Sequence, residues 1–231
     1  MNDEINTYQR RYEIKSVMHN LMVDDFLFKL NFFFNEIKKS YDDRIINNLY
    51  FDNNSYSLVE HHINGAELRK KIRVRWYGDN PIGTPGELQI KWKRNYFNWK
   101  KNYTLSKNFY FNGSSWMFYK KKIMGMLPIE AKTILKLYPR PTVLNKYLRK
   151  YFETDDKQIR VTVDQQITNW SQLSIFKPNL KNYTKLDELS VIEVKIPEDM
   201  YSFAATKLEK LNLYQRRHSK YLKGLYSQFP S

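Results

Sequence analysis

The segment KIRVRWYG, residues 71–78, places a basic residue at every second position. Lys71, Arg73 and Arg75 alternate with apolar residues, so in a β-strand all three cations would lie on one face. Cations held side by side repel one another unless a negative group lies opposite them. Because arginine binds phosphate oxygens through two parallel hydrogen bonds, the segment indicates a strand face that could bind a phosphate-containing anion.

Other segments repeat this alternation and add carboxylates. Five or six segments carry arginine or lysine at alternate positions, and three of them also carry an acid, namely Glu13, Asp164 or Glu193. One charged face is typical of any antiparallel sheet with a hydrated side, but that does not explain why arginine recurs across several segments. Carboxylates placed among phosphate-binding cations could hold a divalent metal ion that bridges phosphate oxygens.

The composition favours a polyanionic partner. Of 231 residues, 39 are Lys or Arg and 24 are Asp or Glu, which gives a formal net charge of +15. Such an excess suits nucleic acid, a membrane surface or a phosphate-rich small molecule. Nucleic acid is disfavoured because the aromatic residues mostly alternate opposite the cations, whereas base stacking requires both on one face. The absence of cysteine excludes disulfides and thiolate chemistry.

The alternating segments are predicted to be β-strands. These strands are expected at residues 12–17, 48–51, 69–77, 86–93, 159–167 and 191–196. The stretch 142–152 suits a helix about as well as a strand. Its Pro-Thr-Val start favours a strand with Tyr147 and Arg149 on one face.

Helices are expected at residues 24–39, 116–124, 128–137, 199–211 and 215–226. The first has acids at its start and lysines at its end, as the helix dipole favours. The Gly- and Pro-rich stretch 78–86 and the polar stretch 176–186 are predicted loops. Together these elements predict an α+β fold with a mainly antiparallel sheet. Since no linker or repeat interrupts the chain, residues 1–231 are expected to form a single domain.

If the sheet closed into a barrel, the charged faces of its strands would line one lumen. Alternate residues of every strand would then point into the lumen. Long cations lining a lumen require an anionic guest, so Arg73 and Arg75 would face a chain of phosphates.

Seven motifs occur along the chain in a consistent order: RRYEIK, NLYFDN, KIRVRWYG, GELQIKWKR, QIRVTVDQQI, SVIEVKIP and HSKYLKG. Together they resemble the VTC-type polyphosphate polymerase domain of the CYTH, or triphosphate tunnel metalloenzyme, superfamily. The resemblance implies an antiparallel eight-stranded β-barrel that forms a tunnel, with helices packed outside. It also implies that the protein binds ATP or another triphosphate together with Mg²⁺ or Mn²⁺. The implied reaction transfers the γ-phosphate of ATP to inorganic polyphosphate.

The resemblance further implies roles for individual residues. The positions that match phosphate-binding cations of the family are Lys15, Arg73, Arg75, Lys91, Lys93, Arg149, Arg160, Lys195 and Lys220. Those implied to be catalytic are Arg73, Arg75, Lys91, Arg149, Arg160 and Lys220. Glu193 matches the metal-ligating glutamate, and Glu13 and Asp164 are further candidates for the metal or for orienting a water molecule. Asp164 could equally be a structural partner of Arg160.

Two departures from the superfamily pattern bear on the reaction. Arg11 stands where many members have the first Glu of an ExExK motif, and Gln89 stands where a second acid is common. Fewer acids indicate one metal ion rather than two, which favours polyphosphate binding over efficient hydrolysis. The alternatives are a metal-dependent inorganic or nucleoside triphosphatase and a non-catalytic protein that binds polyphosphate or RNA.

The sequence also indicates the cellular location of the protein. The N-terminus lacks the apolar region of a signal peptide, and the apolar stretch 26–34 is too short to span a bilayer. We therefore expect a cytoplasmic protein without a transmembrane segment, and the oligomeric state stays open.

Overall fold

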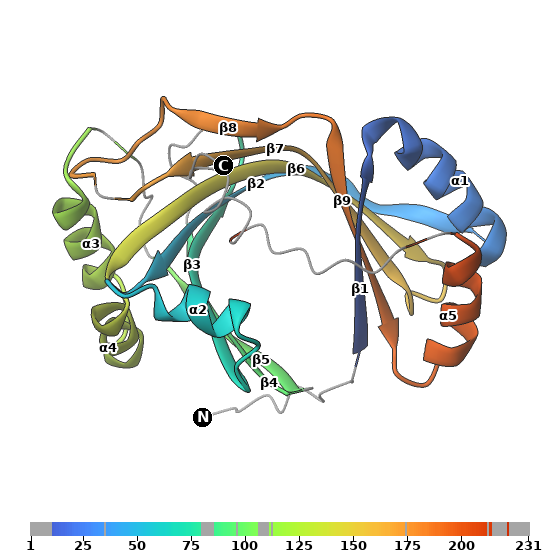
Figure 1. The fold of residues 1–231 in the computed structure, drawn as a ribbon, viewed down its shortest axis with the longest axis horizontal. Helices are drawn as coiled ribbons and strands as arrows, with labels where there is room; N and C mark the ends of the chain where they lie inside the picture. The colour runs from blue at the N-terminus through green and yellow to red at the C-terminus, as the bar shows by residue number, and fades with distance from the viewer. Residues whose placement is uncertain are drawn as a thin grey trace. The chain divides into compact units, whose positions relative to one another are not determined.

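The structure, a computed structural model, describes residues 11–34, 36–79, 86–95, 97–105, 111, 113–173, 175–211, 213 and 221. Figure 1 colours the elements along the chain. The strands are β1 (Arg11–His19), β2 (Ile37–Asp52), β3 (Leu68–Tyr77), β4 (Glu87–Arg94), β5 (Phe97–Thr104), β6 (Arg140–Thr154), β7 (Arg160–Ser171), β8 (Tyr183–Leu186) and β9 (Leu189–Pro197). The helices are a 3-10 turn (Asn20–Met22), α1 (Val23–Phe34), α2 (Ser57–Ile63), α3 (Trp116–Gly125), α4 (Ile129–Leu137) and α5 (Tyr201–Lys210).

The strands described here belong to one nine-stranded sheet, ordered β1-β9-β7-β6-β2-β3-β4-β5, with β8 paired to β7. Every pairing whose register is described is antiparallel. The α+β class with an antiparallel sheet and helices packed on it is therefore confirmed. The structure adds a ninth, short strand to the eight expected, and β1 and β5 stand at the two ends of the order.

The largest difference from the sequence prediction lies between α1 and β2. The sequence predicts a helix to residue 39 and a strand only at 48–51, whereas α1 ends at Phe34 and β2 begins at Ile37. Asn31 Oδ1 accepts a hydrogen bond from the Ile37 backbone N–H at 2.8 Å, and Glu36 has a φ of 62°, which ends the helix. The first half of β2 is mostly exposed, so it lacks the apolar alternation that reveals a strand.

Three short or exposed elements were not predicted. β5 is almost entirely exposed, and β8 has only four residues within the expected loop 176–186. α2 depends on a distant capping group, because the Asp52 carboxylate accepts hydrogen bonds from the backbone N–H groups of Leu58 and Val59. The predicted helix 215–226 lies outside the described residues apart from Tyr221.

The chain divides into two compact units. Unit 1 comprises Met1–Asp43, Leu148–Gln166 and Asp187–His218, and unit 2 comprises Arg44–Tyr147, Ile167–Leu186 and Ser219–Ser231. Strands β2, β6 and β7 contribute residues to both units. Each unit is described by itself below, and the single domain expected from the sequence stays a prediction.

Unit 1 buries one face of β1, β9 and β7 under two helices. α1 and α5 lie beside these strands in Figure 1. The buried side of α1 carries residues spaced three and four apart, which is the spacing of one helix face: Val23, Phe26, Leu30 and Phe34. They pack against strand residues that include Val161, Val163, Ile192 and Val194. Because side chains alternate along a strand, the polar residues between them belong to the opposite face.

Unit 2 is built in the same way around β3 and β4. The apolar residues that separate the cations of KIRVRWYG are buried, and Trp76 is only 1% exposed. They pack with residues of α3 and α4, among them Tyr119, Ile123 and Leu135. Burial of this apolar face therefore fixes the direction of the cationic one. No helix in the described part of the chain is long and apolar enough to cross a membrane.

Leu30→Ala is expected to lower the free energy of unfolding by about 2–5 kcal/mol, because Leu30 is fully buried and its removal leaves a cavity in the core of unit 1. The matched control is Phe28→Ala on the same helix. Phe28 is 74% exposed, so its replacement is expected to change stability by less than about 0.5 kcal/mol. Urea unfolding followed by circular dichroism measures both, and equal losses would contradict the packing of α1 described here.

Candidate functional site

Strands β1, β9 and β7 bring charged side chains of unit 1 to one face. Lys15 lies opposite Glu193, and Glu193 lies opposite Thr162 on the other neighbouring strand. The next same-face row places Glu13 opposite Lys195, which lies opposite Arg160. We call this surface the Glu193 face, and its residues are Glu13, Lys15, Arg149, Arg160, Thr162, Asp164, Glu193 and Lys195.

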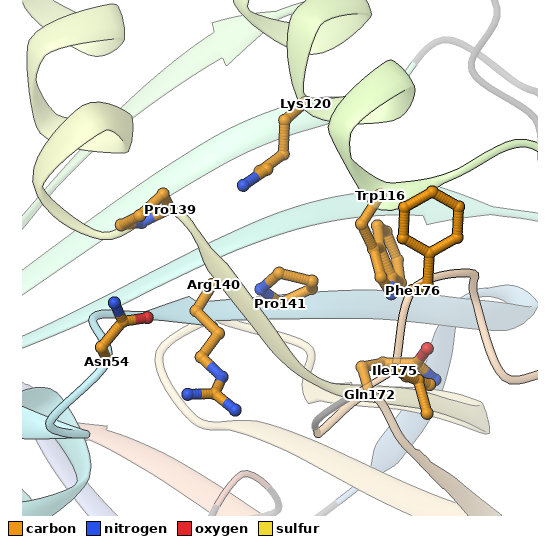
Figure 2. Close-up of a pocket in the computed structure, with 9 residues that line it drawn as sticks. All are labelled: Asn54, Trp116, Lys120, Pro139, Arg140, Pro141, Gln172, Ile175 and Phe176. Carbon is orange, nitrogen blue, oxygen red and sulfur yellow. The ribbon is translucent and has the colours of Figure 1, made fainter.

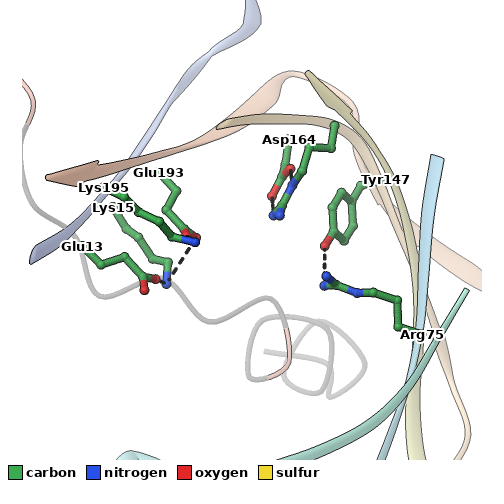
Figure 3. Close-up of polar contacts among 8 residues, drawn as sticks. Glu13, Lys15, Arg75, Tyr147, Asp164, Glu193 and Lys195 are labelled. Carbon is green, nitrogen blue, oxygen red and sulfur yellow. Dashed lines mark hydrogen bonds and ion pairs between the residues drawn. The ribbon is translucent and has the colours of Figure 1, made fainter. Parts of the chain in front are cut away.

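Glu193 lies between two lysines on this face, as Figure 3 shows. Its Oε1 is 3.0 Å from the Lys195 Nζ, and its Oε2 is 3.5 Å from the Lys15 Nζ, which also donates to Glu13. Burial acts to raise the pKa of Glu193, but the charges of Lys15, Lys195 and Arg149 outweigh it and hold the pKa well below its usual range. Glu193 is therefore a carboxylate throughout the physiological pH range.

Asp164 is held by a two-pronged ion pair with Arg149. The Arg149 Nε donates to Oδ1 at 2.6 Å, and its Nη2 donates to Oδ2 at 2.7 Å. The Asp164 side chain is 1% exposed and that of Arg149 is 14% exposed. The structure thus gives Asp164 the partner Arg149 in place of the expected Arg160, which is exposed on β7.

Asp164→Asn is expected to lower the free energy of unfolding by about 3 kcal/mol, because the mostly buried guanidinium of Arg149 would lose the carboxylate that accepts both of its hydrogen bonds to Asp164. The matched control is Asp155→Asn, which removes an exposed ion pair with Lys38 and should leave the urea midpoint almost unchanged. Equal midpoints for the Asp164→Asn protein and the wild type would show that the pair is not structural.

Strands β2, β3 and β4 form a second charged face, in unit 2. Arg75 lies opposite Asn48 on β2 and Glu87 on β4, while Arg73 lies opposite Tyr50 and Gln89. We call this surface the Arg75 face, and its residues are Asn48, Tyr50, Arg73, Arg75, Glu87, Gln89, Asn145 and Tyr147. It is the cationic face predicted from the segment 71–78.

Arg75 is positioned by neutral side chains. Its Nε donates to Asn48 Oδ1 at 2.8 Å, and its Nη2 donates to the Tyr147 hydroxyl at 3.2 Å, the contact drawn in Figure 3. Asn48 is fully buried and donates in turn to Asn145 Oδ1 at 2.9 Å. These groups orient the guanidinium through neutral hydrogen-bond acceptors.

Arg73 is held in a similar way. Its Nε and Nη2 both donate to Gln89 Oε1, at 3.0 and 2.8 Å, and Gln89 donates to Glu87 at 2.9 Å. Burial, followed by the neighbouring charge of Arg75, lowers the pKa of Arg73 from its usual value. Gln89 therefore fixes Arg73 through an amide, where an acid at this position would form an ion pair and neutralise the arginine.

The remaining predicted cations lie further along the sheet or outside the described residues. Lys91 is exposed on β4 and lies opposite Lys71 on β3 and Lys100 on β5. Lys93 is half-buried on the same strand and lies opposite Arg69. The structure thus extends a row of basic residues from the Arg75 face along β4. Lys220 lies outside the described residues, and its role stays a prediction.

Sequence reasoning did not find the neutral partners Asn48 and Asn145. A signal existed for Asn48, because it alternates with Leu49 in a predicted strand and therefore shares a face with Tyr50. The partner strand could not be read from that alternation. The proximity of Asn48 to Arg75 follows only from the pairing of β2 with β3.

Among the carboxylates of the Glu193 face, Glu193 is the one that fits a metal ion. Within the described residues, no three His, Cys, Asp or Glu side chains are grouped so as to hold a metal ion. Both oxygens of Asp164 accept from Arg149, and Glu13 accepts from Lys15. Glu193 is an ionised carboxylate on a cationic face, which fits a divalent ion that takes most of its ligands from phosphates and water.

A pocket of about 320 Å³ lies elsewhere in unit 2, and Figure 2 shows its lining. The residues around it are Asn54, Trp116, Lys120, Pro139, Arg140, Pro141, Gln172, Ile175 and Phe176. None of the residues predicted from the sequence to bind phosphate or metal lines this pocket. Its lining combines aromatic, proline and basic side chains without a carboxylate.

The fold is shared with a protein of known structure. A putative adenylyl cyclase from Hippeastrum, described as having a dominant triphosphatase activity, is 10% identical with a TM-score of 0.51, over 94% of this chain and 96% of that chain. A putative adenylate cyclase from Vibrio parahaemolyticus is 15% identical with a TM-score of 0.48, over 94% of this chain and 98% of that one. At 10% identity the likeness to the Hippeastrum protein concerns the fold alone.

The family comparison is more specific. The family model of the VTC domain matches residues 6–229, which is nearly the whole chain. The chain therefore belongs to the VTC domain family, and the resemblance predicted from the seven motifs is confirmed. No curated protein matches the sequence.

Proposed function

We propose that this chain is a metal-dependent phosphotransferase that binds ATP or another triphosphate and extends inorganic polyphosphate. The observation that carries the proposal is the pair of arginines on the Arg75 face, Arg73 and Arg75, which are oriented by amide and hydroxyl groups. Cations held by neutral partners keep their charge for an anionic ligand. Membership of the VTC family supports a polyphosphate chain as that ligand.

The Arg75 face would bind phosphate groups and stabilise the transferred one. Phosphoryl transfer depends mainly on positioning and on neutralising the charge of the equatorial oxygens. Because Asn48, Gln89 and Tyr147 already hold the guanidiniums, little reorganisation is needed when the substrate binds. The basic row along β4, with Lys91 and Lys93, would bind further phosphates of a long chain.

The Glu193 face would supply the metal site. Glu193 would hold Mg²⁺ or Mn²⁺, which when bound would supply positive charge to neutralise a phosphate-containing donor. Lys15 and Lys195 contact Glu193 and would neutralise phosphate oxygens on either side of it. The exposed Arg160 adds positive charge to the same face, whereas the charge of Arg149 is shared with Asp164.

The ion pairs made by Asp164 and Glu13 support synthesis over hydrolysis. A hydrolase needs a carboxylate to orient water, but Asp164 is occupied by Arg149, and Glu13 accepts from Lys15. In synthesis the acceptor is a phosphate end that is already anionic, so no strong general base is required. The contacts of Asp164 and Glu13 therefore suit transfer to a phosphate acceptor.

The test is incubation with ATP and Mn²⁺ or Mg²⁺, followed by a gel for polyphosphate and an assay for orthophosphate released from tripolyphosphate. A polymer that lengthens with time is the expected result. Orthophosphate release without polymer would overturn synthesis in favour of a triphosphatase. Neither product, together with salt-dependent RNA binding that tripolyphosphate does not affect, would identify a non-catalytic binding protein instead.

A further inference from the structure

Tyr221 is buried in the core of unit 2, although its position in the sequence is far from the strands of that core. It is 2% exposed and packs with Tyr50, Val59 and Val143. Its ring stacks on that of Tyr50, with the centroids 4.8 Å apart and the planes 17° from parallel. A stacked aromatic pair of this kind stabilises the packing beyond what its buried area contributes.

The hydroxyl of Tyr221 is also fixed. It donates to Asp52 Oδ2 at 3.1 Å and accepts from Thr142 Oγ1 at 3.2 Å. Asp52 is fully buried, and its carboxylate also accepts from backbone N–H groups at the start of α2. The ring of Tyr221 is therefore anchored at its hydroxyl as well as by stacking.

Tyr50 connects this anchored ring to the Arg75 face. It lies directly opposite Arg73 in the pairing of β2 with β3, so its side chain is the neighbour of Arg73 on the same face of the sheet. Arg73 is consequently held by the acceptor Gln89 on β4 and flanked by Tyr50 on β2. Gln89 is bonded to Glu87, whereas the ring of Tyr50 is supported by Tyr221.

We propose that Tyr221 is a positioning residue for Arg73, acting through the stacked ring of Tyr50, so that Tyr221 supports the phosphate-binding Arg75 face. The inference rests on the proposed function and goes beyond it by assigning a role to a residue that contacts no phosphate. Without the Tyr221 ring, Tyr50 loses its stacking partner and Arg73 loses a fixed neighbour on β2. Arg73 would then sample orientations that do not bind phosphate.

The experiment measures the Kd of the full chain for sodium tripolyphosphate by calorimetry. Tyr221→Met keeps an apolar side chain in the core but removes the ring, and it should weaken binding by about tenfold, the loss of one stacked support. Tyr221→Phe keeps the ring and should weaken binding by less than about threefold. In an Arg73→Ala background, Tyr221→Met should cause no further loss, because its effect passes through Arg73.

The matched control is Tyr119→Met, which removes another buried tyrosine of unit 2 outside this network. It should lower the thermal midpoint as Tyr221→Met does and leave the Kd unchanged, which separates positioning from general destabilisation.

An unchanged Kd in Tyr221→Met, or an undiminished loss of affinity in the Arg73→Ala background, would overturn the inference alone. If Tyr221→Met fails to fold, Tyr221→Phe is used in the same comparison, and equal losses with and without Arg73 would overturn the inference. Absence of tripolyphosphate binding by the wild type would instead overturn the proposed function and this inference with it.

Discussion

Replacing Arg75 with alanine is expected to lower kcat/KM for the ATP-dependent reaction by about 10²–10³-fold, the usual loss when one pre-oriented donor is removed from the site of developing charge. Arg75 donates to Asn48 and Tyr147, so its guanidinium is held in place before substrate binds. Alanine removes both the positive charge and the pre-oriented hydrogen-bond donors of the guanidinium. Steady-state kinetics with ATP and Mn²⁺ measures the loss, and circular dichroism checks the fold.

Two further variants show whether the charge alone explains the effect. Arg75→Lys keeps the charge but loses the planar fork, so its activity should fall between those of Arg75→Ala and the wild type. Lys146→Ala removes a cation of the same unit that is paired with the exposed Asp79, and it should leave kcat/KM unchanged. A folded Arg75→Ala protein with wild-type activity would exclude the Arg75 face as the phosphate site.

Glu193→Gln is the second substitution with a large expected effect. It keeps the shape of the side chain but removes the charge that would hold the metal ion, so kcat at a fixed Mn²⁺ concentration should fall by about 100-fold. Raising the Mn²⁺ concentration should recover part of the activity, because the amide oxygen is a weaker ligand than a carboxylate. Glu188→Gln, at an exposed position next to β9, is the matched control and should retain full activity. Full activity of Glu193→Gln at every Mn²⁺ concentration would contradict the proposed metal site.

The stability difference between the wild type and Glu193→Gln is also expected to depend on pH. The pKa of Glu193 is lowered in the folded protein, so its ionised form stabilises the fold. This contribution is fully present above the unfolded-state pKa of about 4.3 and is lost as the pH falls towards the folded value. The difference in unfolding free energy between the wild type and Glu193→Gln should therefore be largest near neutral pH and shrink in acid. Urea unfolding at several pH values tests this, and a difference that grows on acidification would contradict it.

The position of the cationic faces could be predicted because it depends on local alternation. In KIRVRWYG the apolar residues had to be buried, and that burial directs Arg73 and Arg75 to the other side. The same argument located β4, β7 and β9 closely, and it placed Glu193 and Lys195 on one face. The seven motifs then predicted the family that the comparison confirmed.

The partners of those cations could not be predicted in the same way. Asn48 meets Arg75 and Gln89 meets Arg73 because β2 and β4 pair with β3 in one particular register. The pairing of Arg149 with Asp164, in place of Arg160, likewise depends on which residues of β6 and β7 come together. A register is set by burial across the whole sheet, and a single strand does not contain that information.

The sequence by itself determined which residues are strand-forming, which face of each strand is charged, and to which family the chain belongs, because each of these follows from periodicity or short motifs. Only the tertiary structure decided that neutral amides hold the arginines, that Asp164 is occupied by Arg149, and that Tyr221 supports Tyr50. The physical reason is that hydrogen bonds and stacking act over a few ångströms in space. Residues as far apart as Tyr50 and Tyr221 come within that distance only once the chain has folded.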